Sequence, residues 1–387
     1  MTFALLVFSP IIRASGKPGK LIDVSPNWKY PDVPMKARGW RRSIRGFGGY
    51  WQGEFTLYGN TNDLAHFFYH NLGGHIEERS GGKKTWEGLI YEMELTTDGS
   101  TRRRTFDSMY NHVRVQYYDT NNELNITSAA TNDGSIQTYG RRELIWPLDS
   151  QDQTPAENVR DKLLQELAYP RAKTAGTELG IVGDASLFVR ACGYVFTANW
   201  RYESAGDDTD DDLSTWVEEI IATDCTDFLQ QGRVQANTDP VRKETRIEMR
   251  AWDVITKMLE IGIDDGTNQV PARAYVDNER FLHYEEINTT PVYFKRGGGF
   301  YTAAGARTEA NPWQVKPAVV RDLTYPIQTF ELDAWLDDAR DWYMNEVDVW
   351  DNQDGTAGLI PKGEEFNESD ILTAQENYKR QIQRMQD

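Results

Sequence analysis

Three histidines in a short stretch are the residues whose spacing most suggests chemistry. His66 and His70 are four residues apart, so they would share one face of a helix, and His75 follows five residues later. Imidazole nitrogens are common ligands of zinc, which takes three or four nitrogen or sulfur ligands. No cysteine or carboxylate pattern completes a familiar motif, and the glutamate of a His-Glu-x-x-His helix is absent. We therefore interpret these histidines as part of a polar face beside a packed helix and predict no metal site.

A second group that could hold an ion is a run of aspartates between positions 207 and 212. Carboxylate oxygens of this kind are ligands that calcium prefers. The spacing differs from that of an EF-hand loop, because the required glycine and glutamate are missing. A solvated acidic loop is the preferred interpretation. The run consists of Asp207, Asp208, Asp210, Asp211 and Asp212.

Patterns typical of enzymes are missing from the sequence. It has no G-x-S-x-G elbow, P-loop, dinucleotide-binding fingerprint or C-x-x-C pair. The glycine-rich run 46–49 precedes a predicted strand and not a helix, which disfavours a phosphate site. The 60 acidic residues offer many carboxylate pairs of the kind that cleave glycosidic bonds, but no spacing singles out one pair. We predict that the protein is not an enzyme, with no catalytic residues and no cofactor.

Length and charge narrow the class of protein. A chain of 387 residues exceeds one ordinary core and suggests two or three domains. The net charge of −18 repels phosphate backbones and disfavours sequence-specific binding of nucleic acid, whereas a conduit through which DNA slides should be acidic. No apolar run approaches the ~18 residues of a membrane span, so we expect no membrane insertion. Two cysteines, Cys192 and Cys225, are too few for a disulfide framework and are expected to be reduced, as in a cytoplasm.

Alternating strands dominate the first predicted domain, residues 1–148. Between positions 50 and 58, Trp51, Phe55 and Leu57 fall on one face and polar residues on the other, which is the period of a half-buried strand. The domain also contains a predicted helix over 62–72 and predicted strands over 86–95 and 113–117.

A clear helix start opens the second predicted domain, residues 149–240. Thr154 is the expected N-cap, Pro155 takes the first helical position, and Glu157 completes a capping box. This domain continues with a predicted strand over 187–200, the acidic loop, and a predicted helix over 215–223.

Helices and strands alternate in the third predicted domain, residues 241–387. A helix over 244–261 is expected to end at Gly262. Further predictions are strands over 273–276, 281–286 and 292–296, a helix around 335–343, and a closing amphipathic helix over 369–385. The predicted fold class is α+β, mainly β.

One part of the chain resembles a known family. The stretch 45–51, the short helix, the segment 86–92 with its aromatic-x-Gly-x-Ile pattern, and the strand 110–117 follow one another in residues 40–118. This order resembles the tube-forming domain of tail-hub and tail-tip proteins of tailed phages. The segments 252–284 and 291–294, with Trp313, are similar to a later region of such proteins.

The resemblance implies barrel-like, tube-forming β domains with short inserted helices. Such domains close into a homo-oligomeric ring, commonly a trimer or hexamer, which joins the tail tube to the tip and leaves a channel for DNA. It implies other tail proteins as partners (tail tube, tape measure, tip or fibre proteins), with assembly in the host cytoplasm and a final place in the virion. We note no lysin domain and no receptor-binding repeat, so hub, distal tail ring and neighbour remain alternatives.

Aromatic residues are the candidate contacts of such a ring, because they are enriched at interface cores. Trp51, Trp86 and Tyr91 are predicted to be either core or inter-subunit residues, with core preferred, and Trp313 and Tyr378 are further interface candidates. Two other functions fit the composition. One is a carbohydrate-active enzyme or lectin-like module, which would use exposed tryptophans and a carboxylate pair. The other is a capsid or neck connector.

Overall fold

A computed structural model shows a chain that is mainly β with short helices, which confirms the predicted fold class. The strands form one mixed sheet of 16 strands and three small sheets. The structure describes residues 3–10, 21–25, 35–45, 48–80, 83–97, 100–149, 152–177, 185–204, 206–243, 249–264, 269–270, 272–277, 279–286, 292–296, 313–315, 340–351 and 357–365.

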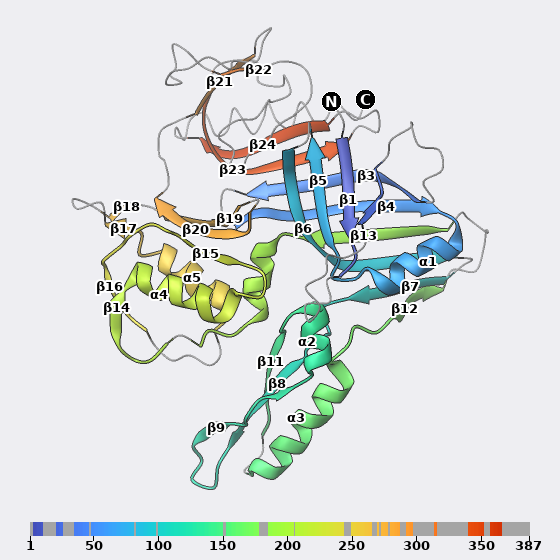
Figure 1. Cartoon of the computed structure of the whole chain (residues 1–387). Coiled ribbons are helices and arrows are strands. Elements are labelled where there is room, and N and C mark those ends of the chain that lie inside the picture. Colours follow the sequence, from blue (N-terminus) through green and yellow to red (C-terminus); the bar gives the residue numbers. More distant parts are fainter. Residues whose placement is uncertain are drawn as a thin grey trace.

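The large sheet is the body of the molecule (Figure 1). It runs in the order β2-β1-β5-β6-β13-β4-β3-β23-β21-β22, with six more strands branching from this path. The path does not return on itself, so the barrel-like wall expected for the first domain is an open sheet in the described residues. The path strands are β1 (Phe3–Phe8), β2 (Leu21–Asp23), β3 (Met35–Arg45), β4 (Gly48–Gly59), β5 (His75–Ser80), β6 (Lys83–Thr97), β13 (Ser186–Cys192), β21 (Val292–Arg296), β22 (Trp313–Val315) and β23 (Arg340–Asp351). The branching strands are β7 (Ser100–Thr105), β12 (Lys173–Thr177), β15 (Gln230–Val234), β19 (Ala272–Val276), β20 (Phe281–Glu286) and β24 (Ala357–Glu365).

Period-two patterning produces the centre of this sheet. Phe55 and Leu57 of β4 are buried, as the alternation predicts, and Trp51 on the same face is half-buried. Helix α1 (Thr61–His70) follows, capped by the Asn60 side chain, and buries Leu64 and two phenylalanines. The strand predicted over 50–58 and the helix predicted over 62–72 are therefore confirmed, and β6 confirms the strand predicted over 86–95.

β13 joins parts of the chain that are far apart in sequence. It comes from the second predicted domain, yet it lies between β4 and β6 of the first and pairs with both in antiparallel register. Gly88 of β6 permits this approach, since a Cβ there would lie 2.3 Å from the carbonyl oxygen of Cys192. One sheet thus spans the predicted boundary at 148, and the division into 1–148, 149–240 and 241–387 stays a prediction.

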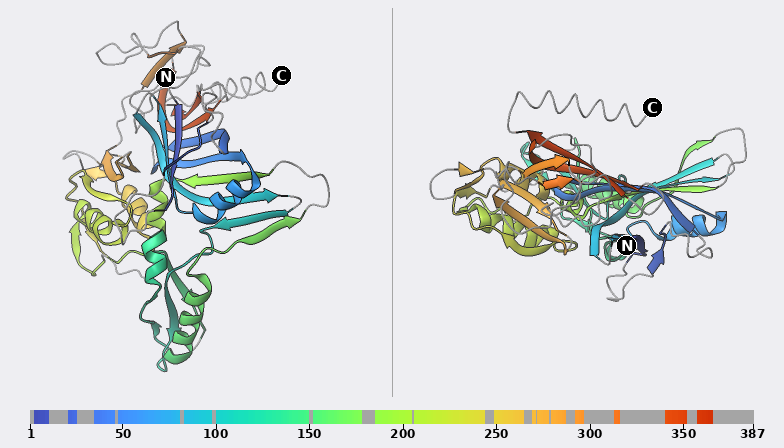
Figure 2. Two further views of the ribbon diagram at one scale, coloured as in Figure 1. Left: turned by 45° about the vertical axis from the view of Figure 1, so that its right-hand side comes forward. Right: turned by 90° about the horizontal axis from the view of Figure 1, so that it is seen from above.

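A narrow lobe projects from the body (Figure 1 and the left view of Figure 2). A four-stranded sheet forms it together with two helices. Its core is small, with Val115, Tyr117 and Ala156 as the buried members. The lobe consists of β8 (His112–Tyr118), β9 (Leu124–Ile126), β10 (Ala130–Thr131), β11 (Glu143–Pro147), α2 (Asp133–Tyr139) and α3 (Gln153–Leu167).

A helical layer flanks the body on the side of β19 and β20 (Figure 1). Leu213, Trp216, Val217 and Ile220 form the buried face of α4 (Leu213–Ile220), and α5 (Ala251–Leu259) buries six residues. Gly262 follows α5 at a φ of +81°, as expected of a helix stop. The layer also contains the 3₁₀ helix Tyr194–Trp200, the π-helical turn Ile221–Cys225, β14 (Asp210–Asp212), β16 (Pro240–Arg242), β17 (Ile263–Asp264) and β18 (Gln269–Val270).

Three local predictions are corrected by the structure. The strand predicted over 187–200 ends at Cys192, because Gly193 turns against β4 and the chain continues as a 3₁₀ helix. The helix predicted around 335–343 is wrong over its described part, since Arg340 begins β23, which pairs with β24 and β3. The N-cap of α3 is Asp152 and not Thr154, whose N–H donates to the Asp152 side chain. The helix predicted over 369–385, with Tyr378, lies outside the described residues.

None of the described helices is both long enough and apolar enough to cross a membrane.

Cys192 and Cys225 are buried free thiols, and burial raises the pKa of each to about 12.

Candidate functional site

The β5–β6 hairpin brings together the potential metal ligands of the described chain. His75 and Glu77 are two residues apart on β5, so their side chains point to the same face of the sheet. Glu87 of β6 is the direct cross-strand partner of Glu77. His75, Glu77 and Glu87 therefore gather at one place, and their ligand atoms all lie within 4.8 Å of one another. We call these three residues the hairpin cluster.

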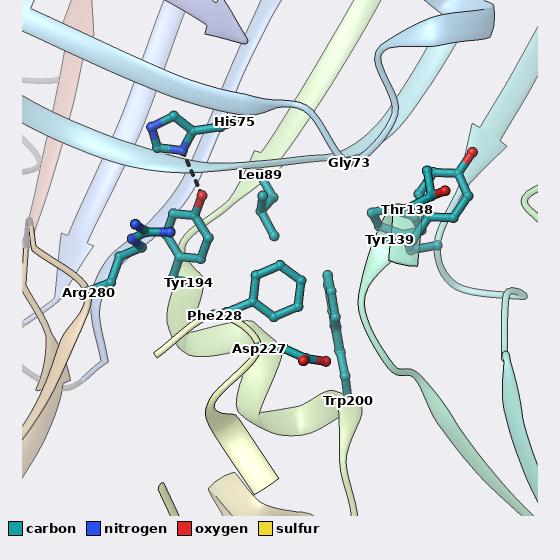
Figure 3. A pocket seen from close by; sticks show the side chains of 11 residues that line it. Gly73, His75, Leu89, Thr138, Tyr139, Tyr194, Trp200, Asp227, Phe228 and Arg280 are labelled. Atoms are coloured by element: carbon teal, nitrogen blue, oxygen red, sulfur yellow. Dashed lines mark hydrogen bonds between the residues drawn. The ribbon is translucent and has the colours of Figure 1, made fainter. Parts of the chain in front are cut away.

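The imidazole of His75 connects the hairpin cluster to the helical layer. Its Nδ1 lies 2.7 Å from the hydroxyl of Tyr194, at the start of the 3₁₀ helix (Figure 3). Its Nε2 lies 3.1 Å from Oε1 of Glu77 and 3.8 Å from Oε2 of Glu87. Both ring nitrogens thus have defined neighbours, and the one facing the carboxylates is Nε2.

Two basic side chains of the same hairpin approach the carboxylates. Nζ of Lys84 is 2.6 Å from Oε2 of Glu87 and 3.5 Å from Oε1 of Glu77, and Arg79 lies 2.6 Å from Oε2 of Glu77. Burial alone would raise the pKa of Glu77, but hydrogen bonds with His75 and Arg79 outweigh it and lower this pKa to about 2. Burial raises the pKa of Glu87, because the attraction of Lys84 and His75 does not fully compensate.

A cavity of about 230 Å³ adjoins the hairpin cluster. His75, Tyr194 and Arg280 line one end of it (Figure 3). Four more aromatic residues line it, Phe106, Tyr139, Trp200 and Phe228, together with one carboxylate, Asp227. Asp227 accepts a hydrogen bond from Arg201 at 2.7 Å, so its charge is already matched by a buried guanidinium.

Comparison with known proteins gives a distant structural likeness. No family model matches the sequence, and no curated protein matches it. Among solved structures, the chain is similar to the 43 kDa tail protein of prophage MuSo2 from Shewanella oneidensis. The two share 9% sequence identity at a TM-score of 0.44, and the alignment covers 93% of this chain and 96% of that one. At this similarity, the function of the chain has to be argued from its own residues.

The three histidines considered from the sequence separate in space. His66 and His70 stay together on the exposed face of α1, with ring centroids 4.5 Å apart. His75 lies on β5 and takes its neighbours from β5, β6 and the 3₁₀ helix. Sequence reasoning missed the hairpin cluster, although the alternation His75-x-Glu77 in a strand was a signal for its first two members.

The acidic run is partly neutralised within the chain. Asp207 and Asp211 lie 3.6 Å and 3.1 Å from Nζ of Lys243, a buried lysine that also reaches Glu219 at 3.1 Å. The last three aspartates form β14, which pairs with β16. An ammonium group of the protein thus stands beside these carboxylates.

The predicted interface residues differ in how deeply they lie. Trp86 is fully buried against Trp40, with ring centroids 5.3 Å apart. Trp51 is half-buried, stacked between Arg45 and Phe196. Tyr91, also half-buried, donates a hydrogen bond to Asp107. Trp86 thus belongs to the core, whereas Trp51 and Tyr91 are partly buried residues packed against it. An interface role of the three stays a prediction.

Trp313 lies in β22, and Tyr378 falls outside the described residues. Their interface role stays a prediction.

Proposed function

We propose that the protein is a structural subunit of a phage tail tip, without catalytic residues. In this proposal copies of the chain form a ring, a trimer or hexamer, that connects the tail tube to the tip and lines the channel for DNA. The observation that carries the proposal is the open large sheet. Among the described strands, β2, β12 and β22 each pair on one side only.

Open strand edges favour assembly because each one presents unpaired backbone N–H and C=O groups to another chain. Monomeric proteins blunt such edges with charges, prolines or coverings. Here β2 is short and polar at Asp23 but exposes Leu21, whose side chain is 52% accessible. A closed ring would pair or bury edges of this kind and give each subunit the same contacts.

The charge of the chain supports the proposed role as the lining of a DNA channel. A net charge of −18 gives repulsion between this protein and the DNA backbone. DNA passing through a channel of such subunits would not be held by the phosphate contacts that dominate nucleic-acid affinity. Binding without sequence specificity, or no binding, is therefore expected.

The carbohydrate-active alternative requires an exposed tryptophan beside a pair of carboxylates. The cavity places Trp200 beside one carboxylate, Asp227, and this tryptophan is only 6% exposed. This cavity therefore lacks the exposed tryptophan and the carboxylate pair that the alternative requires.

Light scattering on the purified full chain tests the proposal. We expect a single species of three or six subunits at concentrations above about 10 µM. Leu21→Lys places a charge on the β2 edge and should shift this species toward monomer. Asn62→Lys, on the exposed surface of α1, adds the same charge away from the edge and should leave the assembly unchanged. A chain that stays monomeric at every concentration, with native circular dichroism, would contradict a self-assembling ring.

A further inference from the structure

The hairpin cluster contains an electrostatic conflict. Glu77 and Glu87 are directly opposite on paired strands, and like charges in this position destabilise a sheet. Both are buried, with side chains 10% and 1% exposed, which removes the water that would screen them. A cation between the two strands is the arrangement that resolves such a conflict.

Arg79 and Lys84 resolve it only in part. Arg79, whose side chain is 42% exposed, lies 2.6 Å from Oε2 of Glu77. The ammonium of Lys84 contacts Oε2 of Glu87 and approaches Oε1 of Glu77, while its side chain remains 23% exposed at the rim. The other carboxylate oxygen of Glu87, Oε1, is buried and has no hydrogen-bond partner in the described part of the chain. A buried acceptor without a partner is costly, so a positive group bound to this carboxylate would stabilise it.

His75 is oriented as a metal-binding histidine is. Such histidines usually make a hydrogen bond with the ring nitrogen that does not bind the ion, which fixes the tautomer and the ring plane. Here Nδ1 pairs with the Tyr194 hydroxyl at 2.7 Å, and Nε2 faces both glutamates. When Nδ1 carries the proton, the lone pair of Nε2 is directed toward the carboxylates, where a cation would accept it.

We propose that His75, Glu77 and Glu87 bind a first-row divalent transition-metal ion, of which Zn²⁺ is the representative. One nitrogen and two carboxylate oxygens are a ligand set that zinc accepts, whereas calcium and magnesium prefer oxygen alone. Tetrahedral zinc with bonds of about 2.0–2.2 Å separates its ligands by about 3.3–3.5 Å. The distances of 3.1 Å and 3.8 Å from Nε2 to the two glutamates bracket that value, and all three ligand atoms lie within 4.8 Å of one another.

Lys84 competes with the ion in this proposal. Metal binding requires its ammonium to leave Glu87, and its position at the rim lets the side chain turn toward solvent. Removing the lysine charge should therefore strengthen binding, an outcome that a purely internal ion-pair network does not predict.

Titration of the metal-stripped full chain with Zn²⁺ at pH 7.5, followed by calorimetry and elemental analysis, tests the site. We expect one tightly bound Zn²⁺ per chain, and no comparable heat from Mg²⁺ or Ca²⁺. Glu77→Gln and His75→Gln should each weaken binding at least about 10-fold, since each removes a ligand. Lys84→Met should strengthen it. Co²⁺ in place of Zn²⁺ should give visible absorption bands that His75→Gln abolishes.

His66→Gln is the matched control, because His66 and His70 form an exposed pair that could bind zinc by itself. This variant should keep the tight site and its cobalt bands. Circular dichroism of every variant separates loss of a ligand from loss of the fold. Loss of zinc in His66→Gln with retention in His75→Gln would overturn the proposal, as would the absence of binding below about 100 µM Zn²⁺ in both the unsubstituted protein and Lys84→Met.

Discussion

The body of the molecule and its projecting lobe bury their apolar residues to different extents. In the body, Trp86, Phe55 and Phe67 are almost completely enclosed within one continuous core. The lobe has three buried apolar residues in its own cluster. Large apolar side chains also remain exposed on it, with Leu124 at 56% and Trp146 at 45%. The body therefore has an extensive core of its own, whereas the lobe combines a small core with exposed apolar side chains.

Buried charged groups lie in the body and at its junction with the lobe. The body encloses ion pairs such as Arg42–Glu78, with both side chains at most 3% exposed. At the junction with the lobe, Arg142 is buried over Trp200, 4.4 Å from its ring, and donates to the carbonyls of Met109 and Phe106. Breaking such buried contacts is costly because a charge is left without a partner. The comparison predicts large effects in the body and at the junction, and small effects at the tip of the lobe.

The largest expected effect is at Gly193, where the 3₁₀ helix meets β4. A Cβ there would lie 1.6 Å from the carbonyl oxygen of Tyr50, while the Gly193 N–H donates to Trp51 at 2.7 Å. Because the obstacle is backbone, Gly193→Ala should cost more than about 4 kcal/mol or prevent folding. Urea unfolding, or soluble yield where the chain does not fold, measures the effect.

Gly39→Ala is the control for this substitution. Gly39 has a φ of +66° but nothing within 4 Å of its Cβ position. Only backbone strain of about 1–2 kcal/mol is expected there. Equal losses of stability in Gly193→Ala and Gly39→Ala would show that the close contact of Gly193 with β4 does not make its substitution more destabilising.

The next largest effect is expected at Trp86. Its fully buried ring packs edge-on against Trp40 and lies beside Tyr50. Trp86→Ala should lower the free energy of unfolding by about 3–5 kcal/mol, because it removes buried area and leaves a cavity. Trp86→Phe keeps most of the contact and should cost less. A loss under about 1 kcal/mol for Trp86→Ala would contradict close packing of the core around this residue.

A pH-dependent effect is expected at the junction, where the His112 side chain is 8% exposed. Burial lowers the pKa of His112 to about 4, although Glu143 acts in the opposite direction, and Arg141, Arg114 and Arg201 add to the decrease. Since the folded pKa lies below the unfolded value, the stabilisation is complete above about pH 6.5 and is lost as the pH falls toward 4.

Between pH 7 and pH 5, the unsubstituted protein should lose about 2 kcal/mol of stability through this group. In urea unfolding, the free energies of unfolding at pH 7 and pH 5 should differ by about 2 kcal/mol less for His112→Gln than for the unsubstituted protein. An unchanged pH dependence in the variant would show that other groups control the acid sensitivity of the junction.

The sequence was sufficient where the pattern is local. Alternation identified Phe55 and Leu57 as the buried face of β4, and the helix predicted over 62–72 is present as α1. The sequence was insufficient where contacts with distant segments determine the local structure. The apolar residues of 187–200 continue past Cys192, and only the approach to β4 shows why Gly193 ends the strand.

The hairpin cluster could be predicted only in part for the same reason. His75 and Glu77 share a strand face by simple alternation. The position of Glu87 depends on the register that sets it opposite Glu77, and that of Tyr194 on the packing of the 3₁₀ helix against the sheet. A shift of one residue in that register would turn Glu87 to the other face.

The smallest expected effect on stability is at Trp146, near the end of β11 in the lobe. Its side chain is 45% exposed, so Trp146→Ala should change the free energy of unfolding by only about 0.5 kcal/mol. Val115→Ala, in the enclosed core of the same lobe, should cost about 1–3 kcal/mol. Urea unfolding of both variants measures this difference within one region.

Trp146→Ala also tests whether the lobe takes part in self-association. If its exposed apolar residues contact a neighbouring molecule, Trp146→Ala should weaken self-association by several-fold, because tryptophan is a frequent interface anchor. Analytical ultracentrifugation over a concentration series would detect the change. An exposed residue with no effect on either stability or association would leave the lobe without a role in the ring, and contacts between subunits would then fall to the edges of the large sheet.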